Sequence, residues 1–212
     1  MEAILQCCRK IIFAQKVNNM RLTEEQRELR WQMENIAYMG IRVIEYFNGI
    51  TGNGGEFWMI TQNCYGEKAC HMWCQLFNSY SDPTHYTKLF GDDRLIELDP
   101  LLSFANVRDR LIASTGLSHA EYDVFRGTVI DFRNKYSAHR EYDSENVTFP
   151  ELDLALLMLH EIRDILKLSI EKELINCSDK DISGQRLYYE HNTGIDLQRR
   201  CRNDISKIQF FE

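Results

Sequence analysis

One stretch of the chain decides the fold class: residues 152–166 have the sequence LDLALLMLHEIRDIL. Apolar side chains recur in it every three or four residues, which is the period of one face of an α-helix. That face consists of Leu152, Ala155, Leu156, Leu159, Ile162 and Leu166. The pattern predicts a helix from Glu151 to about Leu174, with this face in a core or in a dimer seam.

Helical periodicity extends through most of the chain. Two capping boxes, Thr23 with Gln26 and Ser118 with Glu121, predict the starts of two helices. The predicted helices cover about residues 2–17, 23–47, 56–77, 101–113 and 118–138, and residues 78–91 form a polar, turn-rich segment. The glycine-rich run 51–55 favours an interhelical loop over a hairpin or a phosphate-binding loop, because both flanks are helical and no P-loop lysine is present.

No internal repeat and no alternating strand pattern is visible in the sequence. We therefore expect an all-α fold, an up-and-down antiparallel helical bundle formed by residues 1–175. Residues 176–212 are polar, and we treat them as a C-terminal extension of uncertain structure.

The composition restricts the class of protein. The chain has 212 residues, enough for one domain with a substantial core. Its longest apolar run, Leu154 to Leu159, is far too short to span a membrane, and no signal peptide is visible at the N-terminus. An odd number of cysteines, seven, without an export signal favours a reduced, cytoplasmic protein.

Charge is distributed unevenly along the chain. The net charge of −7 argues against a protein that coats nucleic acid, because such binding needs Lys and Arg against phosphates. Residues 141–175 hold nine acidic and three basic residues, a net −6, whereas residues 126–140 carry a net +3 from Arg126, Arg133, Lys135 and Arg140 against Asp131. A confined basic site therefore remains compatible with the acidic total.

Arg133 and His139 are the candidate chemical pair of this basic segment. At about 100° per residue they lie roughly 120° apart on an ideal helix, so they converge only if the helix bends or unwinds near Ser137, or if a second subunit completes the site. A histidine can take a proton from an RNA 2′-hydroxyl, and an arginine can stabilise the extra charge of a phosphorane transition state. The alternative is a solvated helix end, where cations are favoured by the helix dipole.

Several short motifs accompany this pair. They are Arg133-Asn134 with Ala138-His139-Arg140, and upstream Phe57-Trp58, Trp73-Cys74-Gln75-Leu76-Phe77 and Thr84-His85-Tyr86. Together they resemble the HEPN superfamily, whose signature is an arginine followed four to six residues later by a histidine. The likeness is to its abortive-infection U-type branch, and it covers about residues 25–170.

The resemblance implies a specific fold, chemistry and set of partners. HEPN proteins are helical bundles, usually homodimers in which the two motifs face each other, and many are metal-independent endoribonucleases acting as toxins or in phage defence. Carried over by position, Arg133 and His139 are the catalytic pair and Asn134 orients them or the phosphate. Lys135, Arg140 and Arg126 are then expected to bind RNA. No cofactor and no metal is expected, and the expected products carry a 2′,3′-cyclic phosphate and a 5′-hydroxyl.

The resemblance leaves other functions open. Some HEPN proteins are not nucleases, so a non-catalytic module that binds a nucleotide, RNA or a protein remains an alternative. Some HEPN toxins pair with a small nucleotidyltransferase as antitoxin, which makes such a protein a possible partner. A metal- or redox-responsive helical protein that uses its cysteines is a third hypothesis.

The remaining candidate residues have structural interpretations. The group Cys64, Cys70, His71 and Cys74 lacks the second cysteine pair of a structural zinc site, so thiols buried beside Trp73 are favoured. We expect His85 to make local hydrogen bonds in a turn, His119 to face solvent and His160 to lie in the core or an interface. The basic cluster Arg199, Arg200 and Arg202 lies in a neutral segment, which favours a solvated surface over RNA guidance.

Overall fold

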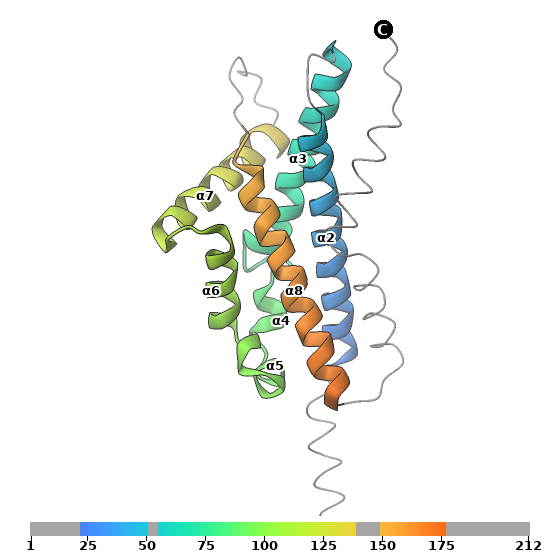
Figure 1. Ribbon diagram of the computed structural model, residues 1–212, viewed down its shortest axis with the longest axis vertical. Coiled ribbons are helices and arrows are strands. Elements are labelled where there is room, and N and C mark those ends of the chain that lie inside the picture. The colour runs from blue at the N-terminus through green and yellow to red at the C-terminus, as the bar shows by residue number, and fades with distance from the viewer. Residues whose placement is uncertain (1–21, 51–54, 139–148, 177–212) are drawn as a thin grey trace, which may run out of the picture.

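The computed structural model describes residues 22–50, 55–138 and 149–176. These residues form seven α-helices, and no strand occurs among them (Figure 1). The helices are α2 (Glu24–Gly49), α3 (Gly55–Phe77), α4 (Thr87–Phe90), α5 (Asp93–Leu98), α6 (Phe104–Thr115), α7 (His119–Phe132) and α8 (Leu152–Asn176). The predicted all-α fold is confirmed, and the long helices α2, α3 and α8 pack together as a bundle.

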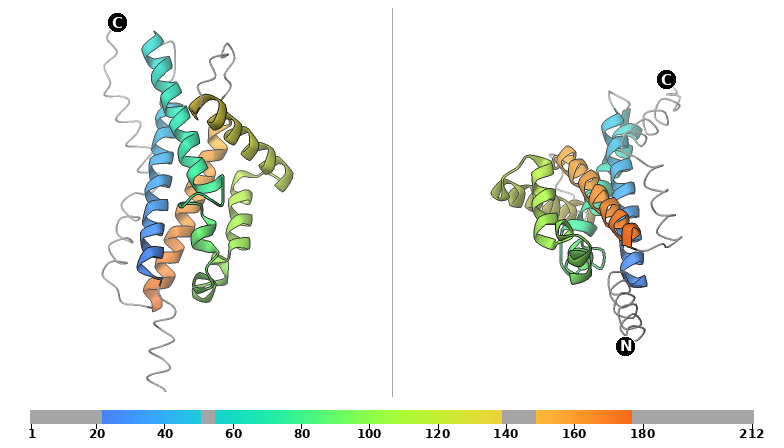
Figure 2. Two further views of the ribbon diagram at one scale, coloured as in Figure 1. Left: turned by 180° about the vertical axis from the view of Figure 1, so that it is seen from behind. Right: turned by 60° about the horizontal axis from the view of Figure 1, so that its bottom comes forward.

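The bundle has a simple arrangement in space. Helices α3 and α8 lie between α2 on one side and the segment from α4 to α7 on the other (Figures 1 and 2). The two ends of α2 and α8 identify an antiparallel pair. Asn48 near the end of α2 donates a hydrogen bond to Asp153 at the start of α8, at 2.9 Å. At the opposite end the amide of Leu22 donates to Glu173, at 3.2 Å.

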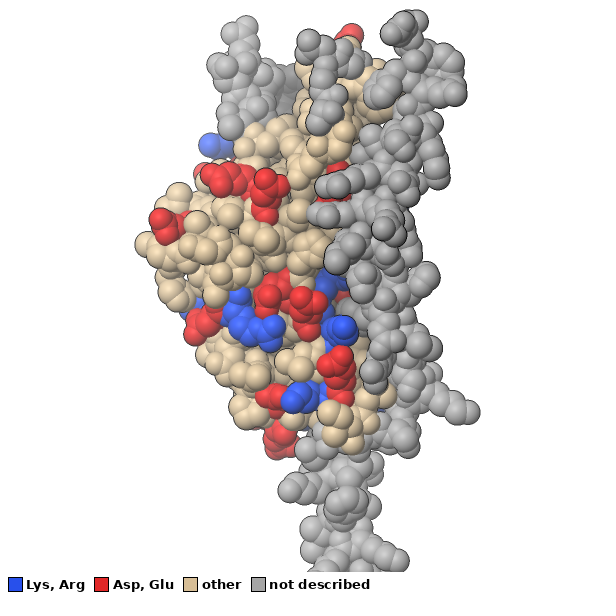
Figure 3. Space-filling view, in the orientation of Figure 1, with Lys and Arg blue, Asp and Glu red and all other residues tan. Residues whose placement is uncertain are grey.

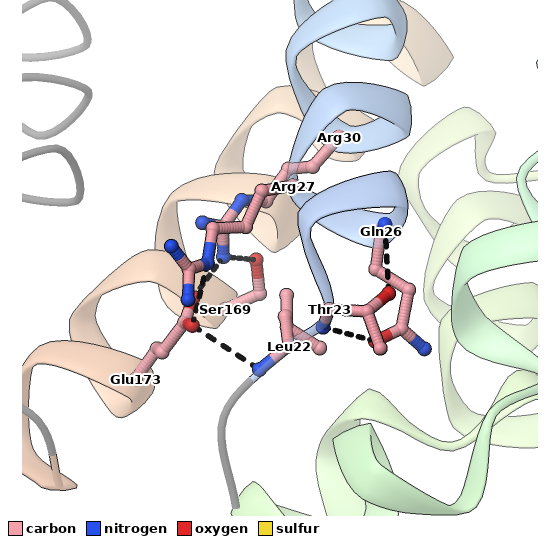
Figure 4. Close-up of polar contacts among 7 residues, drawn as sticks. All are labelled: Leu22, Thr23, Gln26, Arg27, Arg30, Ser169 and Glu173. Atoms are coloured by element: carbon pink, nitrogen blue, oxygen red, sulfur yellow. Dashed lines mark hydrogen bonds and ion pairs between the residues drawn. The ribbon is translucent and has the colours of Figure 1, made fainter.

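Buried ion pairs join α2 to α8. Arg30 and Glu173 are both fully buried, and their charged groups lie 2.9 Å apart (Figure 4). Arg27 approaches the same carboxylate at 3.4 Å. One turn further along α2, Glu34 accepts from Arg163 at 2.7 Å. Partners of opposite charge are what make burial of these groups tolerable, because an isolated ion would lose its hydration.

The predicted apolar face of α8 forms the centre of the core. Leu159, Ile162 and Leu166 on this face have no exposed surface. Trp73 of α3 is equally buried, and its ring meets Phe125 of α7 edge to face at 5.5 Å. The core therefore joins the two sides of the bundle through α3 and α8.

Both predicted capping boxes are confirmed. The hydroxyl of Thr23 accepts from the amide of Gln26 at 3.2 Å, and the Gln26 side chain accepts from the Thr23 amide at 2.8 Å. Ser118 and Glu121 make the same reciprocal pair at the start of α7. Each such cap stabilises its helix by about 1 kcal/mol.

Between α3 and α6 the structure is more helical than predicted. The sequence suggested turns over residues 78–91 and a helix from Leu101, whereas the chain forms α4, α5 and a short 3₁₀ turn, Pro100–Leu102. Aspartates begin two of these elements: Asp92 caps α5 and Asp99 caps the 3₁₀ turn. Elements this short have too few residues to establish a period, so the pattern did not reveal them.

The helix predicted to reach Ala138 changes its winding before it ends. The α-helical part, α7, stops at Phe132, and residues Arg133–Ala138 form a π-helix, η2. A π-helical turn inside or beside an α-helix is rare and occurs frequently at functional sites. The predicted helix over residues 2–17 and the extension 176–212, apart from its first residue, lie outside the described residues.

The membrane prediction agrees with what the structure describes. Among the described residues, no helix combines the length and the apolar character that crossing a bilayer requires.

Candidate functional site

Arg133, the arginine of the candidate pair, follows the end of α7, where α7 lies against α3. Phe132, the last residue of α7, is buried, and its ring packs on Phe149 with centroids 4.7 Å apart. Phe149 in turn covers Gly66 of α3, where a methyl group would overlap the Phe149 ring. This contact anchors the end of α7, so that the next residue, Arg133, starts η2 at a defined place beside α3.

Arg133 is half-buried at this boundary, and its head group contacts α3. The guanidinium bears electrostatically on the thiol of Cys74, a buried residue. Burial raises the pKa of Cys74 to about 11, although the nearby Arg133 opposes this rise. A thiol with this pKa stays protonated at neutral pH and is a weak acceptor. The Nε atom of Arg133 is buried and has no hydrogen-bond partner among the described residues.

His71 is the histidine that the described structure places near Arg133. It is half-buried on α3, one turn before Cys74. Burial lowers the pKa of His71, Arg133 and Lys68 lower it further, and Glu67 opposes them. The imidazole is therefore neutral at pH 7. The sequence suggested His71 only as a zinc ligand, because nothing in the local pattern indicates proximity to a residue 62 positions later.

The other predicted site residues that the structure describes are either exposed or bonded to the backbone of α3. Asn134 and Lys135 are exposed on η2. Arg126 is half-buried, and its guanidinium donates hydrogen bonds to the backbone carbonyls of Phe77 and Asn78 at the carboxyl end of α3. A cation is favoured there by the helix dipole. The predicted role of Arg126 in RNA binding therefore coexists with a structural contact.

His139 and Arg140 lie outside the described residues, as does the cluster Arg199, Arg200 and Arg202. The predicted convergence of Arg133 and His139 thus stays a prediction. The helix does change its winding within this segment, because the π-helix extends over Arg133–Ala138 and includes Ser137.

His85 makes the local hydrogen bonds that the sequence predicted. It is almost fully buried, and its Nδ1 atom lies 2.7 Å from the hydroxyl of Thr87 and accepts from the Thr87 amide at 3.3 Å. Burial lowers the pKa of His85 to about 4, so the ring is neutral at physiological pH. His85 therefore secures the turn after α3 and is sealed from solvent.

The cysteines and the remaining histidines are placed mainly as expected. Cys70 and Cys74 are buried thiols in the same core as Trp73, as predicted, whereas Cys64 is exposed. Within the described ranges no group of three or more His, Cys, Asp or Glu could hold a metal ion. His119 faces solvent, and burial lowers the pKa of the half-buried His160.

Comparisons with known proteins add no assignment. No protein-family model, no curated protein and no solved structure matches this chain.

Proposed function

We propose that the chain is a metal-independent endoribonuclease of the HEPN type, with an up-and-down antiparallel bundle fold. One observation carries the proposal: the arginine of the signature, Arg133, stands at the first residue of a π-helix, with exposed polar residues Asn134 and Lys135 directly after it. This places an arginine and neighbouring polar groups where the backbone departs from regular helix geometry, as is frequent at functional sites.

In the proposed reaction the RNA supplies its own nucleophile. His139 takes the proton of a 2′-hydroxyl, and the oxygen attacks the adjacent phosphorus. The bond from phosphorus to the 5′-oxygen breaks, and this oxygen takes a proton from water to leave as the 5′-hydroxyl. Arg133 stabilises the charge that accumulates on the phosphorane, and Asn134 orients the phosphate. Lys135, Arg140 and Arg126 contact the RNA backbone. The proposal includes a homodimer in which two motifs meet, a cytoplasmic location and a toxin or phage-defence role with an antitoxin such as a small nucleotidyltransferase.

The charge pattern favours a confined site over an extended RNA surface. On the face drawn in Figure 3, basic and acidic side chains are interleaved over the lower half of the described surface. Together with the net charge of −7, this arrangement predicts weak RNA binding away from the motif that declines further as salt rises.

The deciding experiment is RNA cleavage by the full chain in EDTA. We expect Arg133→Ala and His139→Ala to lose at least about 100-fold in rate, since general acid–base catalysis and oxyanion stabilisation each contribute on that order. The matched controls are Arg108→Ala and His119→Ala, which remove an exposed arginine and an exposed histidine elsewhere. Cleavage should also decline at pH 5, because an imidazole that acts as general base must be neutral. If the purified dimer leaves diverse RNAs intact, or both motif variants cut as well as the controls, the nuclease proposal is wrong.

A non-catalytic HEPN module is the second candidate. The observation that favours it is that the described part of the motif consists of the half-buried Arg133 with exposed Asn134 and Lys135, polar groups that can bind an anion without cleaving RNA. This candidate predicts that RNA or a nucleotide binds at the motif and is released unchanged.

A further inference from the structure

The outer face of α2 points away from α3 and α8, the two long helices that pack on it (Figures 1 and 2). Residues spaced three or four positions apart form this face: Glu24, Glu28, Trp31, Asn35 and Met39. Trp31 and Met39 are large apolar side chains, yet 52% and 41% of their surface is exposed. Apolar side chains that share one face of a helix are typical of a helix that packs against a further element.

The exposed charge at the start of α2 is negative. Its first two turns expose three glutamates, Glu24, Glu25 and Glu28. The two arginines of this part of the helix, Arg27 and Arg30, are directed instead to Glu173 of α8 (Figure 4). An element that packs on the outer face of α2 is therefore expected to combine apolar side chains with positive charge.

The sequence of residues 1–21 combines these two properties. One acidic residue, Glu2, stands there against four basic residues, which are Arg9, Lys10, Lys16 and Arg21. Ile4, Cys8 and Ile11 recur at the spacing of one helix face, which is part of the pattern that predicts a helix over residues 2–17. Residues 176–212, by contrast, contain six basic and six acidic residues, so their net charge does not favour an acidic surface.

The length and the attachment point of this segment also fit the outer face. The segment joins α2 through Leu22, whose amide is held by Glu173 at the start of α2. A helix over residues 2–17 is about 24 Å long. Trp31 and Met39 lie about 11 and 23 Å along α2 from Glu24, at 1.5 Å per residue. Residues 18–21 provide a connection of the length that joins antiparallel helices, so a helix that folds back along α2 reaches both apolar side chains.

We propose that residues 2–17 dock as an antiparallel helix on the outer face of α2 in the same chain. Ile4, Cys8 and Ile11 then cover the two exposed apolar side chains. The antiparallel direction brings Lys16 to the glutamates of the first turns of α2 and Cys8 to the level of Asn35. The proposal does not depend on RNA cleavage, because it concerns how the outer face of α2 is covered.

The test is chemical crosslinking of the full chain that carries Asn35→Cys. A bismaleimide is used that spans about 8–10 Å, the distance between the axes of packed helices, and mass spectrometry identifies the linked peptides. We expect Cys8 to be linked to the new thiol at position 35. On a denaturing gel this product keeps the mass of one chain, whereas a link between two copies gives the mass of two.

The matched control is Val124→Cys. Val124 is 71% exposed on α7, on the side of the bundle away from α2 (Figure 1). A thiol at this position is equally accessible to the reagent, but it should not be linked to Cys8.

Charge reversal tests the electrostatic part of the proposal. The combined substitutions Glu24→Lys, Glu25→Lys and Glu28→Lys should slow the link between Cys8 and position 35 by about 3-fold or more. Exposed ion pairs are individually weak, but here three attractions are replaced by repulsion. Adding Arg9→Glu and Lys16→Glu should restore most of the rate, which a merely structural effect of the lysines would not allow.

Three crosslinking results overturn the proposal: no link between Cys8 and position 35, an equally fast link to position 124, or a product that has only the mass of two chains. The last result would place the segment on a second copy of the chain. A charge-reversed variant that is linked as fast as its parent also overturns the proposal, because the choice of this segment rests on its positive charge.

Discussion

Two interfaces of the bundle differ in how their charged side chains are paired. Between α2 and α8, buried arginines meet buried carboxylates: Arg30 meets Glu173 and Arg163 meets Glu34. Between α3 and η2, the guanidinium of Arg133 is half-buried, and its buried Nε atom has no hydrogen-bond partner among the described residues. A fully buried ion is tolerable only when a partner of opposite charge compensates its lost hydration, whereas a half-buried guanidinium also keeps contact with solvent. The first interface therefore stabilises the bundle, and the second leaves part of a cation accessible.

Glu173→Ala tests the first interface and should have the largest effect. The substitution removes the carboxylate from Arg30 and from the Leu22 amide, so a fully buried guanidinium loses its counter-ion. Removal of one partner from a buried pair costs about 3–5 kcal/mol. Urea unfolding measures this loss in the free energy of unfolding.

Asp164→Ala is the control for that measurement. It removes an exposed carboxylate from the same helix and should change stability by less than about 0.5 kcal/mol. Equal losses in the two variants would mean that the buried pair makes no special contribution, and the comparison between the interfaces would fail.

A decrease in pH tests the packing of the turn that follows α3, through His85. Burial lowers the pKa of His85 to about 4, while its unfolded value is about 6.5. The unfolded chain therefore binds the proton more readily. The stability contributed by neutral His85 is complete above pH 6.5 and is lost as the pH falls from 6.5 to 4. The loss is on the order of 3 kcal/mol.

The measurement is urea unfolding of wild type and His85→Gln across this pH range. The His85→Gln variant should be less stable at pH 7. It should lack most of the decline in the free energy of unfolding that the wild type shows between pH 6.5 and 4. His119→Gln, which changes an exposed histidine, should retain the full decline. A wild-type curve that stays flat over this window would contradict the buried, neutral state of His85.

Features of the fold that depend on neighbouring residues in the chain could be predicted from the sequence. The periodic face of α8 and the capping boxes at Thr23 and Ser118 predicted long helices that the structure contains. The sequence did not reveal α4 and α5, which are too short for periodicity. It suggested a bend or unwinding near Ser137 only as one condition under which Arg133 and His139 would converge, and the structure has a π-helix over Arg133–Ala138. A π-turn depends on packing against a neighbouring helix, which no local pattern encodes.

Contacts between residues that are far apart in the sequence could not be predicted, for a different reason. Arg30 and Glu173 have the appearance of surface residues in their own helices, and only the docking of α2 on α8 buries them together. Likewise, His71 and Arg133 are ordinary polar residues until α3 and η2 pack. Without an account of tertiary packing, the sequence indicated Arg133 as a site residue but did not indicate its neighbour.

Gly66→Ala tests how firmly the second interface is packed, and it should have the smallest effect of the three. A methyl group at Gly66 would overlap the ring of Phe149, which also packs on Phe132 directly before Arg133. Gly127→Ala is the matched control, since Gly127 lies exposed in α7 with no atom close to the new methyl group. Alanine in a helix is favoured over glycine by about 1 kcal/mol, so Gly127→Ala should stabilise the protein.

Both variants gain the same helix preference for alanine. The difference between their free energies of unfolding therefore measures the cost of the overlap with Phe149. We expect Gly66→Ala to be less stable than Gly127→Ala by about 1–3 kcal/mol, measured by urea unfolding. If Phe149 is displaced, the start of η2 should move with it, and the pKa of His71 should shift towards its ordinary value as Arg133 moves away. Equal stabilisation by both substitutions would show that Phe149 yields freely, in which case the boundary beside Arg133 is not a preformed site.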